Sequence, residues 1–132
     1  MLKQMRSQGL DKIGEQIIFN ALVVSRIMYA SQAFNGYLCE YDIAKLQAIL
    51  NKAYRYKIIA NKMDAKQMFE SADVKLFSAI TRVNGHCLQP LLLPKPVTSM
   101  QLRPRGHNFQ LPNVETELHK LSYLVRCLYK YV

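Results

Sequence analysis

Residues 42–59, DIAKLQAILNKAYRYKII, predict an amphipathic helix and so point to an all-α fold. Apolar residues recur in this stretch at intervals of three and four, the spacing of one face of an α-helix. These residues are Ile43, Leu46, Leu50 and Ala53. Cationic residues recur at intervals of seven and three, close to two turns and one turn, so they share a different face. They are Lys45, Lys52 and Arg55. We therefore expect a helix that packs with one side and presents positive charge on another.

Helical periodicity also runs through the chain before and after this stretch. Residues 11–34 predict one helix capped by Asp11, and because it is apolar around most of its circumference we expect it to lie centrally. Short helices are predicted after Asp64 and after Asp73, and the second is expected to end at Asn84–Gly85. The inward-facing side chains expected in the first helix and in the last helix of the chain include Ile13, Ile17, Val24, Leu118, Leu121 and Leu128.

A proline-rich connector precedes the last helix. Residues 91–112, LLLPKPVTSMQLRPRGHNFQLP, hold four of the five prolines, three cationic side chains and no carboxylate. The segment is longer than the ~12–15 residues usual for a loop inside a compact domain, so we expect it to dock on helices. The predicted organisation is a helical region at residues 1–92, the connector at 93–114 and a C-terminal helix at 115–132. The predicted fold class is therefore all-α, an irregular bundle of about five helices with a long proline-rich connector before the last helix.

The charge of the chain indicates an anionic partner. Its 132 residues include 18 lysines and arginines against 9 aspartates and glutamates, a formal net charge of +9. Such an excess attracts polyanions, and nucleic acid is the expected one, while an anionic membrane surface or simple solvation stays open. Three cysteines, far apart and without a Cys-x-x-Cys pair, favour a reducing intracellular compartment. Charged residues interrupt the N-terminus, and no uncharged run reaches the ~20 apolar residues of a membrane span, so neither a signal peptide nor a span is expected.

Residues able to catalyse a reaction or hold a metal form no recognised pattern. His119 and Cys127 are the nearest pair of metal-ligating type, but they lie eight residues apart on one predicted helix, too far along its axis to chelate together. Asp42, Asp64 and Asp73 each stand where a helix is predicted to begin, so capping accounts for them better than a two-metal site does. We therefore expect no catalytic residue, no metal site and no cofactor.

The candidate binding residues are cations that continue from residues 42–59 into the following turn. They are Lys45, Lys52, Arg55, Lys57 and Lys62, with Lys66 as a further extension. Tyr54 and Tyr56 lie among them and would stack on a base or a sugar. The alternative is an ordinary solvated helix face with its tyrosines in the core. The net charge of +9 favours contact with nucleic acid.

Several motifs follow one another in an order known from one family. Residues 22–29 read LVVSRIMY and are followed by Ala30, and residues 41–55 read YDIAKLQAILNKAYR. Leu76–Phe77, a histidine–leucine–proline stretch at 86–94, LRPRGHNFQLP at 102–112 and SYLVRCLYKYV at 122–132 come after them. In this order the motifs resemble the region after the palm of LINE-type (non-LTR) retrotransposon reverse transcriptases, where glycine is frequent at the position of Ala30. The second helix matches the family pattern at Asp42, Leu46, Gln47, Lys52, Ala53 and Arg55.

The resemblance implies the thumb-like and C-terminal portion of an RNA-directed DNA polymerase. In that family the thumb helps to hold the primer–template duplex, and the palm supplies the aspartates that bind metal. This chain has no palm motif, so the resemblance implies a fragment that does not catalyse on its own and that contacts an RNA or DNA duplex backbone weakly and without sequence specificity. Two alternatives stay open. The fragment is either a protein-interaction piece whose helix at residues 11–34 packs on the missing palm, or a degenerate remnant without function. No membrane partner is expected, and the oligomeric state and the choice of nucleus or cytoplasm stay open.

Overall fold

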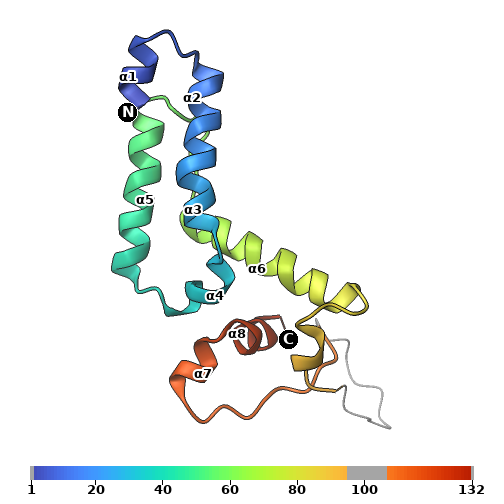
Figure 1. Ribbon diagram of the computed structural model, residues 1–132. Coiled ribbons are helices and arrows are strands. Elements are labelled where there is room, and N and C mark those ends of the chain that lie inside the picture. The colour runs from blue at the N-terminus through green and yellow to red at the C-terminus, as the bar shows by residue number, and fades with distance from the viewer. Residues whose placement is uncertain (1, 95–106, 132) are drawn as a thin grey trace. The chain divides into compact units, whose positions relative to one another are not determined.

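The computed structural model describes residues 2–94 and 107–131, and these residues contain helices and no strand (Figure 1). The α-helices are α1 (Leu2–Ser7), α2 (Lys12–Phe19), α3 (Ser25–Met28), α4 (Ser31–Phe34), α5 (Glu40–Arg55), α6 (Ala65–Arg82), α7 (Glu117–Leu121) and α8 (Tyr123–Lys130). A π-helical turn, η1 (Asn20–Val24), and two 3₁₀ turns, η2 (Asn35–Tyr37) and η3 (Gln89–Leu91), lie between them. The predicted all-α fold class is confirmed. Residues 95–106, which include most of the predicted connector, lie outside the described residues.

The chain forms two compact units, each built from segments that are separate in the sequence. Unit 1 combines Met1–Ser31 with Leu38–Glu70, and unit 2 combines Gln32–Tyr37 with Ser71–Val132. Helix α6 contributes its first residues to unit 1 and the rest to unit 2.

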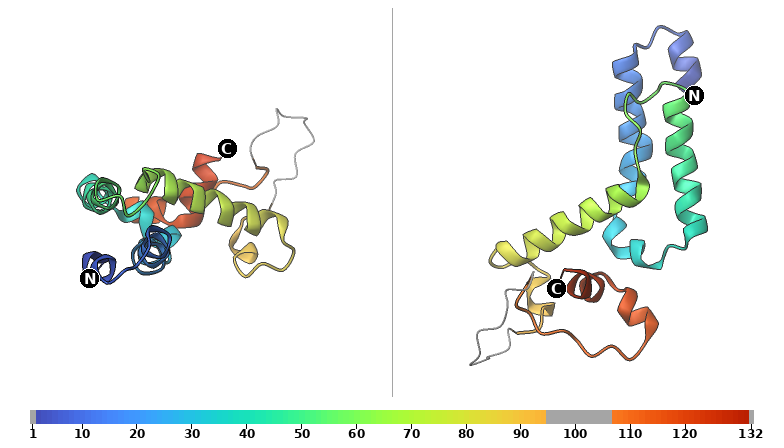
Figure 2. Two further views of the ribbon diagram at one scale, coloured as in Figure 1. Left: turned by 90° about the horizontal axis from the view of Figure 1, so that it is seen from above. Right: turned by 180° about the vertical axis from the view of Figure 1, so that it is seen from behind.

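In unit 1, α2, η1 and α3 follow one another and run beside α5 (Figures 1 and 2). The buried apolar side chains of this unit are Phe19, Leu50, Ala53, Ile59, Ala65 and Phe69. Helix α1, which periodicity did not predict, is joined to this core by charge. Its Arg6 pairs with Glu15, a residue only 1% exposed, and also donates a hydrogen bond to the Tyr56 carbonyl at 3.3 Å.

The single central helix expected at residues 11–34 is wrong in two respects. Asp11 does cap its start by accepting a hydrogen bond from the Gly14 N–H at 3.0 Å, but the helix ends at Met28, and Ala30 turns the chain with a φ of +49°. Ile13 and Ile17, expected inside, are 70% and 62% exposed. Only one side of this helix is covered in the described part of unit 1, and that side carries Phe19 and the charge-paired Glu15, so the expected packing on several sides is not found.

One stretch of the described residues, Lys12–Tyr37, is long and apolar enough to cross a membrane, and an 18-residue window within it has a mean hydropathy of 1.3. Length and composition alone support this. It differs from the expectation based on uncharged runs because a hydropathy average tolerates charged residues such as Arg26, which lies exposed in the middle of the stretch.

In unit 2, the core joins α6, Leu92 after η3, and α8. Its buried side chains are Phe77, Ile80, Leu92, Cys127 and Leu128. His107 fixes the end of the connector to this core, because its ring donates from Nε2 to the Leu128 carbonyl at 2.7 Å and accepts at Nδ1 from the Phe109 N–H at 3.2 Å. The Tyr129 hydroxyl likewise donates to the Pro112 carbonyl at 2.9 Å. The described end of the connector is therefore docked on a helix, as the sequence predicted.

A buried ion pair joins three segments of unit 2. Arg126 on α8 donates to Asp73 on α6 at 2.8 Å and to the Gln32 carbonyl at 3.4 Å. The Asn35 side chain donates to the same carboxylate at 3.3 Å. A Cβ added at Gly36 would collide with the Arg126 guanidinium and the Leu121 carbonyl, so only glycine fits between α4 and the α7–α8 turn.

The two helices predicted after Asp64 and Asp73 are one continuous helix, α6. Asp64 is a cap, accepting from the Gln67 N–H at 3.2 Å, but Asp73 is buried within the helix and is neutralised by Arg126 rather than acting as a cap. The predicted end at Asn84–Gly85 is close to the observed end at Arg82. The last helix is divided at Ser122 into α7 and α8, and Leu118, expected inside, is 70% exposed.

Burial also governs the chemistry of the unit 2 core. Desolvation raises the pKa of the Cys127 thiol to about 11, and burial raises the pKa of the Tyr123 hydroxyl, which donates to the Asp73 carbonyl at 3.0 Å. Both groups are therefore protonated and neutral at physiological pH.

Candidate nucleic-acid interface

Helix α5 separates an apolar side from a cationic side. Leu50 and Ala53 are 1% and 3% exposed and pack in unit 1, as predicted. Lys45, Lys52 and Arg55 are exposed. At about 1.5 Å rise per residue, Lys52 lies about 10 Å along the axis from Lys45, and Arg55 lies about 4.5 Å farther. The three cations therefore form a row on a helix that is held rigidly from its other side.

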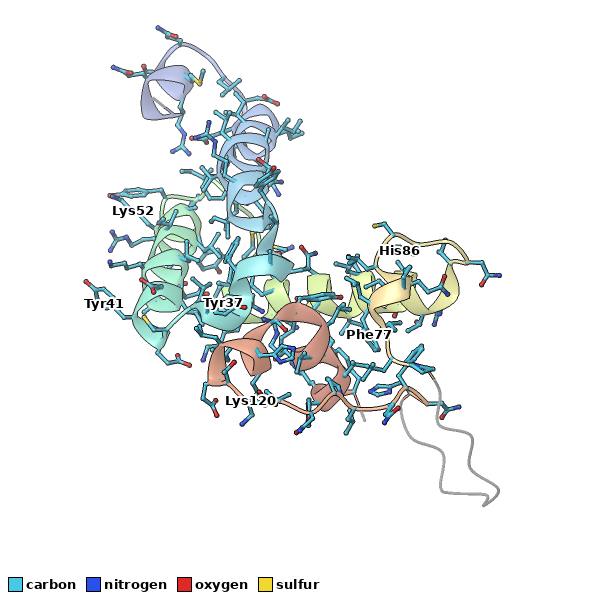
Figure 3. The ribbon with its side chains drawn as sticks, turned by 60° about the horizontal axis from the view of Figure 1, so that its bottom comes forward. Tyr37, Tyr41, Lys52, Phe77, His86 and Lys120 are labelled. Atoms are coloured by element: carbon cyan, nitrogen blue, oxygen red, sulfur yellow. The ribbon has the colours of Figure 1, made fainter. Side chains whose placement is uncertain are left out.

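The same row includes an aromatic residue that sequence reasoning did not select. Tyr41 lies one turn before Lys45 and is 68% exposed, and the Lys45 ammonium lies 4.1 Å from the centre of its ring. Figure 3 shows Tyr41 near the start of α5 and Lys52 near its end. The available signal was the interval of four residues between Tyr41 and Lys45, which places both on one helix face.

The predicted cations have no carboxylate partner among the described residues. Within the described part of the chain, none of them forms an ion pair. They are Lys45, Lys52, Arg55, Lys57 and Lys62. Lys66 differs, because it pairs with Glu40 at 2.9 Å, and the hydrogen bond and charge of Glu40 raise the pKa of Lys66. Lys66 is therefore not part of the open cationic surface.

The two tyrosines that the sequence placed among the cations are at the surface rather than in the core. Tyr54 is 46% exposed and Tyr56 is 39% exposed, and the Arg55 guanidinium lies 5.5 Å from the ring centre of Tyr56. Half-exposed tyrosine rings beside cations are able to stack on bases, which single-stranded nucleic acids present without sequence restriction.

The chain turns sharply after α5, and a cavity of about 510 Å³ lies there. The turn depends on Lys57, whose φ of +56° is in the left-handed region. Arg55, Lys57 and Tyr54 line the cavity from this side, and Lys12 and Gln16 line it from α2. Lys62 is exposed but does not line the cavity, so the structure brings together two of the five predicted cations here and adds Lys12.

Sequence reasoning missed Lys12 because its contribution depends on the pairing of α2 with α5, which no local pattern encodes. The only available signal was a cation directly after the Asp11 cap.

Within residues 2–94 and 107–131, no group of three or more histidine, cysteine or acidic side chains is placed to hold a metal ion. Comparison with protein-family models, with curated proteins and with solved structures found no match to this chain.

Proposed function

We propose that this chain binds the backbone of nucleic acids through the cationic side of α5, without sequence specificity. The observation that carries the proposal is the row of Lys45, Lys52 and Arg55, three exposed cations on one packed helix that have no carboxylate partner among the residues the structure describes. Lysine and arginine at such positions neutralise phosphates, which positions a duplex but does not read its sequence.

We further propose that the chain is the non-catalytic, thumb-like end of a LINE-type reverse transcriptase. The ordered motifs quoted above support this origin. The turn at Ala30 adds support, since the family pattern has glycine there and the φ of +49° is one that glycine adopts without strain. A thumb contributes grip on a duplex and leaves the chemistry to the palm, in keeping with the absence of a paired-aspartate motif from the sequence.

The test is the salt dependence of duplex binding. For three phosphate contacts on B-DNA, the logarithm of the binding constant should fall with the logarithm of salt concentration at a slope of about −2.7. The double variant Lys45→Ala/Lys52→Ala should reduce the magnitude of that slope by about 1.8. The matched control is Lys75→Ala/Arg82→Ala, which removes the same charge from exposed positions elsewhere. Equal slopes for the two double variants would overturn the proposal.

A second candidate function is contact with a protein partner, and a specific feature favours it. Five exposed residues between the start of α2 and Tyr29, directly after α3, recur at intervals of four, and all but the serine are apolar. They are Ile13, Ile17, Ala21, Ser25 and Tyr29. Such a row, left open, promotes self-association of the isolated chain. Sedimentation should show association that weakens in Ile13→Ser/Ile17→Ser, and a monomer at all concentrations would argue against this function.

A further inference from the structure

The cavity at the end of α5 differs from the open row in that cations from two segments line it. Lys12 comes from the start of α2, and Arg55 and Lys57 come from the end of α5 and the turn after it. None of the three forms an ion pair with a carboxylate in the described chain, and no carboxylate lines the cavity. Positive charge is therefore concentrated in a concave site instead of spread along a helix.

The number of cations indicates which form of phosphate the cavity fits. A phosphodiester carries one negative charge, and a terminal phosphate ester carries about −1.5 to −2 at neutral pH with three acceptor oxygens. Three cationic residues lining one cavity exceed what a single phosphodiester needs and match a terminal phosphate better. Arg55 adds a planar fork of donors suited to phosphate oxygens.

The remaining walls suit a nucleoside. Tyr54 and the apolar residues Ile58 and Ile59 line the cavity, and Gln16 adds an amide that can both donate and accept hydrogen bonds. The volume of the cavity, about 510 Å³, is within the range of roughly 300–1,000 Å³ that is usual for small-molecule sites, which combine apolar walls with a few polar groups. A tyrosine ring offers a stacking surface for a base.

We propose that this cavity binds a nucleotide through its terminal phosphate, with Lys12, Arg55 and Lys57 on the phosphate and Tyr54 beside the base. The site goes beyond the backbone contact of α5, shares Arg55 with that row, and adds Lys12 and Lys57. The terminal phosphate comes either from a free nucleotide or from the phosphorylated end of a strand.

The experiment is calorimetric titration of the full chain with adenosine 5′-monophosphate, adenosine and inorganic phosphate. We expect the monophosphate to bind at least tenfold more tightly than either of the others. Lys12→Ala and Lys57→Asn should each weaken its binding about tenfold, as expected for loss of one charged hydrogen bond. Asparagine is chosen at position 57 because it tolerates the left-handed backbone there. Lys75→Ala, at an exposed position remote in sequence, removes the same charge and should leave the affinity unchanged.

The two phosphate sources are separated by a short oligonucleotide with a 5′-phosphate and the same strand with a 5′-hydroxyl. Tighter binding of the phosphorylated strand, lost in Lys12→Ala, assigns the site to strand ends. Binding of the mononucleotide without this difference assigns it to free nucleotides. Equal affinity for adenosine and its monophosphate, equal affinity for inorganic phosphate, or equal weakening by Lys75→Ala would overturn the proposal. Because a mononucleotide has no duplex backbone, these outcomes are independent of the salt-slope experiment on α5.

Discussion

The ion pair between Asp73 and Arg126 allows a direct measurement of what burial adds to a salt bridge in this protein. Its nitrogen and oxygen lie 2.8 Å apart, with side-chain exposures of 19% for Arg126 and 6% for Asp73. The pair between Glu40 and Lys66 has nearly the same separation, 2.9 Å, but exposures of 82% and 56%. The two pairs therefore differ mainly in their access to water.

The expected magnitudes differ accordingly. Removing one partner of a buried ion pair costs about 3–5 kcal/mol, because the other charge is left without compensation. Arg126 keeps two weaker bonds, to the Gln32 and Leu121 carbonyls at 3.4 and 3.3 Å, and retains some exposure, so we expect about 3 kcal/mol for Asp73→Ala. An exposed pair contributes about 0–1 kcal/mol, so Glu40→Ala should cost less than about 1 kcal/mol.

The assay is urea unfolding followed by circular dichroism, with single and double variants of both pairs. Replacing Asp73 and Arg126 together by Leu and Met should restore part of the stability lost in Asp73→Ala, because no charge is then left buried alone. If unit 1 and unit 2 unfold in separate transitions, each pair is compared within the transition of its own unit. A loss for Asp73→Ala no larger than that for Glu40→Ala would refute the reasoning from burial.

The left-handed backbone at Ala30 predicts that Ala30→Gly raises the free energy of unfolding by about 0.5–1 kcal/mol, as measured by the same urea titration. Glycine relieves about 1–2 kcal/mol of backbone strain in the folded state, and its greater conformational freedom in the unfolded state offsets part of that gain. Burial of Cys127 predicts a loss of stability at alkaline pH. Its pKa rises from 9.0 in the unfolded chain to about 11 in the folded one, so its contribution is complete below pH 9 and is lost as the pH rises through 11, by at most about 2.7 kcal/mol. Unfolding curves of Cys127→Ala should lack that component between pH 9 and 11, and an unchanged alkaline loss would contradict the assignment.

The fold class, the inward stripe of α5 and the exposure of its cations were predictable because each depends on local periodicity. Leu50 and Ala53 are buried and Lys52 is exposed for reasons contained within one helix. The errors arise where a distant residue decides the outcome. Asp73 resembles a cap in the sequence, but Arg126, 53 residues later, turns it into a buried ion-pair partner inside a continuous helix.

The same limit applies to the candidate site. The row on α5 follows from spacing, whereas the cavity needs Lys12 from one segment and Lys57 from another, and only the pairing of α2 with α5 brings them together. Ile13 and Ile17 are residues for which a regular local pattern predicted packing that the structure does not show, because both are exposed. Their spacing is that of a packed face, but the described parts of unit 1 supply no element to cover it.

The order in which a ribosome delivers the chain has a consequence for unit 2. Gln32, whose carbonyl accepts from Arg126, is made 94 residues before its partner. At about 5–20 residues per second, that interval lasts roughly 5–19 s. Throughout this time the early segment around Gly36 lacks α8 to pack against, so a chain whose translation stops before Arg126 leaves this segment without its partner.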